Sequence, residues 1–237
     1  NTLKSYRSAL EKFELSVRLY QEIGDKGNAG SSLLGVGLIQ NLLFENDAAL
    51  ASYQKALAIF REIGHKELEA RALNNIGRLY DEIGEKQKAL DHHFQALPLR
   101  LITGDKYGEA NSLNSIGSVY ADLGERRKAI EHFERALKIQ TETDDKRAQA
   151  ITLSNLGRLY DELGEAGRAL ELLERSLELR RTVGDKNGEA TSLNNIGMVL
   201  AGKGDYAAAI ERYQRSLAIL TELGFENRKA GVLNNIG

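Results

Sequence analysis

The sequence lacks cysteine and tryptophan and contains a single proline among its 237 residues. Without thiols, the chain has no disulfide framework, no thiolate zinc site and no cysteine nucleophile. Lys and Arg total 32 against 34 Asp and Glu, so no overall positive charge attracts nucleic acid or an anionic lipid surface. No run of about 18 apolar residues is present, which argues against a membrane-spanning helix. The absence of thiols fits a cytoplasmic protein, and we expect that location.

Glycine is abundant instead, with 23 residues, and most of these recur at a spacing of 40 residues. Three series share this spacing: Gly37, Gly77, Gly117, Gly157, Gly197 and Gly237; Gly24, Gly64, Gly104, Gly184 and Gly224; and Gly84, Gly124, Gly164 and Gly204. A fixed period of about 20 to 50 residues indicates a tandem array of structural repeats.

Each repeat has the pattern of two helices. Between residues 66 and 84, apolar and small residues recur at helical spacing, and Gly84 stands where a left-handed residue ends a helix. A second such stretch ends at Gly104, and Asp105 follows as an N-cap for the next helix. Gly77 falls in mid-helix, where Gly is about 1 kcal/mol less favourable than Ala, so we expect a neighbouring helix to approach too closely for a Cβ. No segment alternates with a period of two, so we expect an all-α fold.

The repeat resembles the tetratricopeptide repeat on the spacings Leu73-x2-Ile76-Gly77-x2-Tyr80 and Ala89-x3-His93-x2-Ala96. That family usually repeats at about 34 residues and ends each repeat with a proline. This chain departs from that pattern, with a 40-residue period and no such proline. The long form, with its LNNIG and GDK signatures, is similar to the arrays of Pins-type cell-polarity adaptors and of bacterial signalling proteins. The resemblance implies a right-handed α-solenoid of antiparallel helix pairs that stack into a superhelix.

The 40-residue period extends over residues 1–237, so we expect a single array. Residues 1–24 match the second helix of a truncated repeat, and residues 225–237 match the start of a further one. The complete repeats are 25–64, 65–104, 105–144, 145–184 and 185–224. Solenoids end in polar capping helices, and the pattern contains none. We therefore expect a fragment of a longer array, whose apolar ends favour end-to-end self-association.

Three sequence patterns could indicate a nucleotide, metal or catalytic site, but their positions in the repeat argue against each of these functions. Residues 197–204 match a phosphate-binding loop except for its final Ser or Thr, and they lie at a helix end rather than after a strand. The four histidines are not at metal-ligand spacing. The paired acids Asp81 and Glu82 fall at a helix end, as surface charge does. We expect no catalytic residue, no cofactor and no metal.

In stacked pairs of this kind, the first helices line the concave face. The candidate partner-binding residues at the facing positions are Arg71, Asn74, Arg78 and Asp81; Asn111, Asn114 and Ser118; Ser154, Arg158 and Asp161; Asn194 and Met198; and Asn234. Asn carries both donors and acceptors, so a row of Asn can bond an extended peptide, and the two Arg at 78 and 158 can pair acidic groups. The adjacent Asn75, Asn155, Asn195 and Asn235 either bind a ligand as well or hold the helices together.

The sequence therefore predicts a non-enzymatic protein-interaction scaffold that binds a protein or peptide ligand in its concave groove. Nucleic acid and membrane are not expected partners, because the groove is neither basic nor rich in stacking aromatics. One alternative stays open: a sensor or regulatory arm of a larger signalling protein, an NTPase or a protease-like enzyme, whose catalytic part lies outside these residues.

Overall fold

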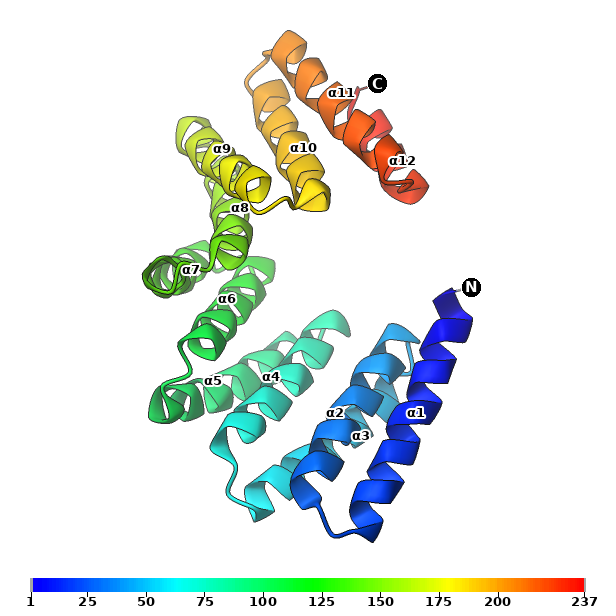
Figure 1. Ribbon diagram of the computed structural model, residues 1–237. Coiled ribbons are helices and arrows are strands. Elements are labelled where there is room, and N and C mark those ends of the chain that lie inside the picture. The colour runs from blue at the N-terminus through cyan, green and yellow to red at the C-terminus, as the bar shows by residue number, and fades with distance from the viewer. Residues whose placement is uncertain (1, 237) are drawn as a thin grey trace. The chain divides into compact units, whose positions relative to one another are not determined.

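The computed structural model describes residues 2–236, and within that range every regular element is an α-helix (Figure 1). The chain divides into two compact units, Asn1–Leu123 and Gly124–Gly237, which are described separately. The all-α fold of antiparallel helix pairs expected from the sequence is confirmed. None of the helices in the described range is sufficiently long and apolar to cross a membrane.

Over residues 2–236, six helices belong to the first unit and six to the second. The first six are α1 (Thr2–Glu22), α2 (Lys26–Leu42), α3 (Asn46–Glu62), α4 (Lys66–Glu82), α5 (Lys86–Thr103) and α6 (Lys106–Asp122). The others are α7 (Arg126–Glu142), α8 (Lys146–Glu162), α9 (Ala166–Thr182), α10 (Lys186–Gly202), α11 (Tyr206–Glu222) and α12 (Glu226–Ile236). Within each unit, consecutive helices pack against one another in antiparallel fashion (Figure 1).

Carboxylate caps begin the even-numbered helices at most of the joints. Asp25, Asp105, Asp145 and Asp185 each accept a hydrogen bond from the backbone N–H three residues later, at 2.8–3.0 Å. A negative side chain here satisfies an orphan N–H and lies at the positive end of the helix dipole. At α4 the same position is His65, whose Nδ1 accepts from the Leu68 N–H at 3.4 Å.

Within a pair, the second helix packs against the first at a glycine. A Cβ on Gly37 would lie 2.6 Å from the Tyr53 ring, and a Cβ on Gly197 would lie 2.5 Å from the Tyr213 ring. At Gly77 the neighbour is the His93 ring, at 2.7 Å. The expectation that no Cβ fits at these positions is confirmed, and the group that excludes it is a large side chain on the second helix.

The hydrophobic core of each unit runs through the middle of these pairs. Its wholly buried side chains include Phe60, Leu73, Ile76, Leu79, Leu113 and Ile116 in the first unit, and Leu153, Leu173, Leu177, Leu193 and Ile196 in the second. Since each pair buries its apolar face against its neighbours, stability comes from nearest-neighbour interfaces.

Replacing Gly157 with Ala should destabilise the protein, although Ala is the better helix former. The new Cβ would lie 2.7 Å from Leu173 Cγ and 3.2 Å from the Ala169 carbonyl oxygen. Overpacking typically costs about 1–3 kcal/mol, which exceeds the gain in helix propensity of about 1 kcal/mol. We expect urea unfolding to show a lower free energy of unfolding for Gly157→Ala.

The matched control is Gly167→Ala in α9, where a Cβ would meet nothing within 4 Å. This variant should keep or slightly raise the free energy of unfolding, by less than about 1 kcal/mol. Equal effects of the two substitutions would show that the close approach at Gly157 does not hold the pair.

Candidate functional site

The candidate residues lie on the first helix of each pair: α4, α6, α8, α10 and α12. Within the first unit α2 contacts α4 and α4 contacts α6, and within the second unit α8 contacts α10. The exposed candidates are Arg71, Arg78, Asn111, Arg158, Met198 and Asn234; the half-buried ones are Asn74, Asp81, Asn114, Ser118, Asp161 and Asn194; and Ser154 is buried.

Internal ion pairs occupy part of this surface in the first unit. Asp81 Oδ1 accepts a hydrogen bond from Lys86 Nζ at 2.7 Å. Arg78 Nη2 lies 3.9 Å from Glu82 Oε1, one helical turn away, and both side chains are about half exposed. An ion pair as exposed as the one between Arg78 and Glu82 contributes about 0.5 kcal/mol or less to stability. Arg78 can therefore exchange Glu82 for a ligand group at little cost.

Asn74 contacts the second helix of its own pair. Its Oδ1 lies 2.9 Å from His93 Nδ1, so a neutral ring protonated at Nδ1 donates to the amide. His93 is wholly buried, and its Nε2 has no hydrogen-bond partner among the described residues. Burial lowers the pKa of His93 to about 4, assisted by the neighbouring charges of His92 and Arg78. The ring is therefore a neutral core residue at pH 7.

In the second unit, the structure brings three of the candidates into one pocket between α8 and α10. This α8–α10 pocket has a volume of about 200 Å³. Its lining residues are Arg158, Asp161, Glu162, Leu173, Asn195, Met198 and Val199. Charged groups on α8 thus face an apolar wall supplied by α9 and α10.

Only part of the charge in the α8–α10 pocket is neutralised from within. Glu162 Oε2 accepts a hydrogen bond from Arg126 Nε at 3.2 Å. Arg158 and Asp161 make no ion pair with any residue that the structure describes. Burial raises the pKa of Asp161 above its usual value, and the charge of Glu162 raises it further. The pocket therefore presents one uncompensated cation and one uncompensated carboxylate.

The second Asn of the repeated Asn pair links neighbouring first helices. Asn195 Nδ2 donates to Ser154 Oγ at 3.3 Å, and Asn235 Nδ2 donates to Asn194 Oδ1 at 2.9 Å. Ser154 is covered by this contact, which explains why a residue expected at the surface is only 5% exposed. At these two positions, the adjacent Asn holds the stack together.

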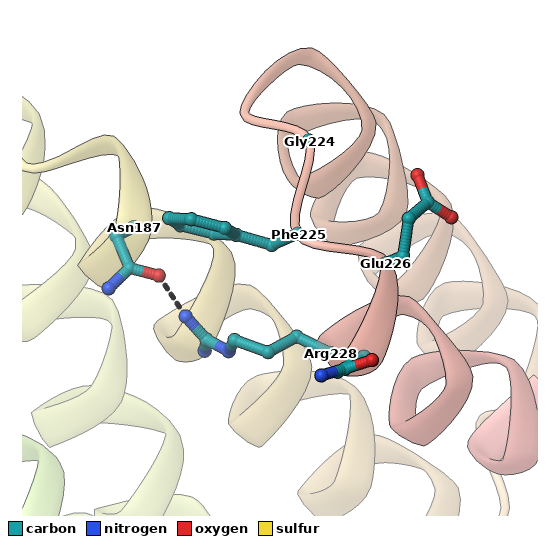
Figure 2. Close-up of a pocket in the computed structure, with 6 residues that line it drawn as sticks. Asn187, Gly224, Phe225, Glu226 and Arg228 are labelled. Atoms are coloured by element: carbon teal, nitrogen blue, oxygen red, sulfur yellow. Dashed lines mark hydrogen bonds between the residues drawn. The ribbon is translucent and has the colours of Figure 1, made fainter. Parts of the chain in front are cut away.

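A pocket of about 240 Å³ lies between α10 and α12 and includes Asn194, Asn227 and Asn235. A wider one, of about 430 Å³, opens at the turn before α12 (Figure 2). There Phe225 takes the place of the capping Asp, and Arg228 donates to Asn187 Oδ1 and to Thr191 Oγ1. Because Arg228 already bridges to α10, this opening is a joint between helices.

Sequence reasoning missed Glu162, Leu173 and Val199 as lining residues and assigned Asn195 no single role. The signal for Glu162 was its place beside Asp161 at the end of a helix, where neighbouring first helices meet.

The stretch similar to a phosphate-binding loop lies in α10 and the turn after it, with Gly197 and Gly202 both helical. Among residues 2–236, no three His, Asp or Glu side chains gather in a way that could hold a metal ion.

Comparison with protein-family models matches this chain to the tetratricopeptide repeat over residues 31–101, 108–182 and 168–222, which is more than half of its length. A search of curated proteins found no match.

Several solved structures share the fold. BtubC (BKLC) from P. vanneervenii aligns with a TM-score of 0.78 and 21% identity, over 94% of this chain and 91% of that one. The apo form of RapI aligns with a TM-score of 0.77 and 19% identity, over 86% and 74%. A Rap protein complexed with Competence and Sporulation Factor aligns with a TM-score of 0.72 and 16% identity, over 99% and 70%.

Lowering the pH should destabilise the protein through His93. Between pH 6.5 and pH 4, the His93 ring is protonated in the unfolded chain, where its pKa is near 6.5, but stays neutral in the folded chain, where its pKa is about 4. Its stabilising contribution is therefore complete above pH 6.5 and is lost as the pH falls toward 4. At about 1.4 kcal/mol per pKa unit, this amounts to up to about 3 kcal/mol.

Urea unfolding at pH 7 and pH 4.5 measures this loss. The control is His93→Tyr, since Tyr53 and Tyr213 fill the matching sites against Gly37 and Gly197. The variant should lose clearly less free energy of unfolding between the two pH values than the unchanged protein. Identical losses would assign the acid sensitivity to other groups.

Proposed function

Because the chain belongs to the tetratricopeptide repeat family, we propose that it is a non-enzymatic scaffold that binds a peptide or partner segment on its first helices. The α8–α10 pocket carries this proposal, since uncompensated charges border an apolar wall on a rigid helical support. Exposed polar clusters on such a scaffold are typical of binding surfaces. The Rap protein complexed with Competence and Sporulation Factor has the same fold, which supports a binding role.

Each pocket side chain suits recognition of an extended segment in its own way. The Arg158 guanidinium offers a planar set of donors that match a carboxylate or a backbone carbonyl. Met198 is flexible and polarisable, and it is 51% exposed, so it can adapt to an apolar ligand group. We assign the outward-facing residues of the first unit, Arg71, Arg78 and Asn111, to the same role.

A second candidate is a regulatory arm within a longer signalling protein. The match to RapI covers 74% of that chain, so helix pairs of this fold occur beside further sequence. For either candidate, we propose that the complete repeats are 25–64, 65–104, 105–144, 145–184 and 185–224. We also propose that they belong to the long type of repeat found in Pins-like adaptors. The sequence of the whole gene separates this candidate from a free-standing scaffold.

Substitution of the pocket should weaken peptide binding. A display library of random decapeptides is selected against the unchanged protein, and the enriched peptides are synthesised for fluorescence polarisation. The double variant Arg158→Ala and Met198→Ala should bind them at least about tenfold more weakly, because a hydrogen bond to a charged group is worth about 1.5–3 kcal/mol.

The matched control is Arg175→Ala, which removes an exposed Arg from α9, the second helix of the same pair. It should leave peptide affinity unchanged. If no peptide is enriched, or if Arg175→Ala weakens binding as much as the pocket variant does, the proposed binding surface is wrong.

A further inference from the structure

At the turn between α4 and α5, a lysine of the chain itself neutralises a carboxylate at the end of a first helix. Lys86, the first residue of α5, places Nζ 2.7 Å from Asp81 Oδ1. The same Nζ also pairs with Asp122 Oδ2 at the end of α6. One lysine thus compensates two carboxylates on neighbouring first helices, and its side chain is only 25% exposed.

Eighty residues later, two repeats along the array, the carboxylate is retained but the lysine is not. Asp161 occupies the position of Asp81 near the end of α8, and Ala166 occupies the position of Lys86 at the start of α9. The two turns have the same backbone, because Gly84 and Gly164 are both left-handed, with φ of 85° and 78°. The space that Lys86 fills in the first unit is therefore not filled by residue 166 in the second.

Two other cations of the second unit, Arg126 and Arg168, are already engaged. Arg126 pairs with Glu162 at 3.2 Å. Arg168 lies over the Tyr160 ring, 3.9 Å from its centroid, in a cation–π geometry. Arg158 lies three residues before Asp161 and makes no ion pair with it. Asp161 thus remains a half-buried carboxylate without a counter-ion in the part of the chain that the structure describes.

We propose that Asp161 binds a lysine or arginine side chain of the partner segment, which enters the α8–α10 pocket in the position that Lys86 holds in the first unit. This inference rests on the proposed function. The apolar wall of Met198 and Val199 suits the aliphatic stem of such a side chain, whose charged end then meets the carboxylate. The positive charge of Arg158 disfavours consecutive basic residues, so the preferred segment carries an acidic residue beside the basic one.

The variant Ala166→Lys tests the inference by supplying the missing lysine from within the chain. Ala166→Gln, which is similarly long but uncharged, is the matched control. Both variants, Asp161→Asn and the unchanged protein are screened with the same random decapeptide library, and circular dichroism checks the fold. NMR titration of the Asp161 carboxyl reports whether the introduced lysine reaches it.

We expect peptides enriched on the unchanged protein to carry Lys or Arg at one fixed position. Ala166→Lys should lower the Asp161 pKa and bind these peptides at least tenfold more weakly, whereas Ala166→Gln should retain most of the affinity. Asp161→Asn should lose the preference for a basic residue.

Enriched peptides without a basic position would overturn the inference and leave the proposed function standing, as would full affinity in Ala166→Lys. An unchanged Asp161 pKa in Ala166→Lys would overturn the geometry that the inference uses. Failure to enrich any peptide would overturn the proposed function together with this inference.

Discussion

The contact between a glycine on a first helix and a large side chain on the second helix sets both the spacing and the rotation of the helix pairs that lie within one unit. Gly77, Gly157 and Gly197 point into the pair, against His93, Leu173 and Tyr213. In an α-helix the next residue lies about 100° further round. The residues that follow these glycines are Arg78, Arg158 and Met198, and all three are exposed. The packing contact therefore decides which side chains are offered to a partner.

The sequence pattern was sufficient for the fold because its strongest signals are local. The glycine period, the helical spacing of apolar residues and the capping Asp all act within about one helix and its neighbour. The pattern predicted that a neighbouring helix approaches Gly77 closely, and the structure shows that the group there is the His93 ring. Which side chain fills such a gap depends on the crossing of two helices, and no local periodicity contains that information.

The site was less predictable for a related reason. Asn194 and Asn195 are adjacent and both half-buried, yet Asn195 bonds the preceding first helix and Asn194 accepts from the following one. Their roles depend on the distance between pairs. Long charged side chains add a second difficulty, since Lys86 reaches Asp122, 36 residues away. Such partners become visible only when neighbouring helices are placed side by side.

The hydrogen bonds from Asn195 to Ser154 and from Asn235 to Asn194 each join residues 41 positions apart. A bond of this separation survives only if the intervening segment keeps its length. Insertion or deletion of part of a repeat would displace every later contact of this kind, whereas gain or loss of a whole 40-residue unit would restore the same pairing. Arrays built in this way can lengthen or shorten in evolution by entire units, and each added unit brings its own variable surface without altering the joint.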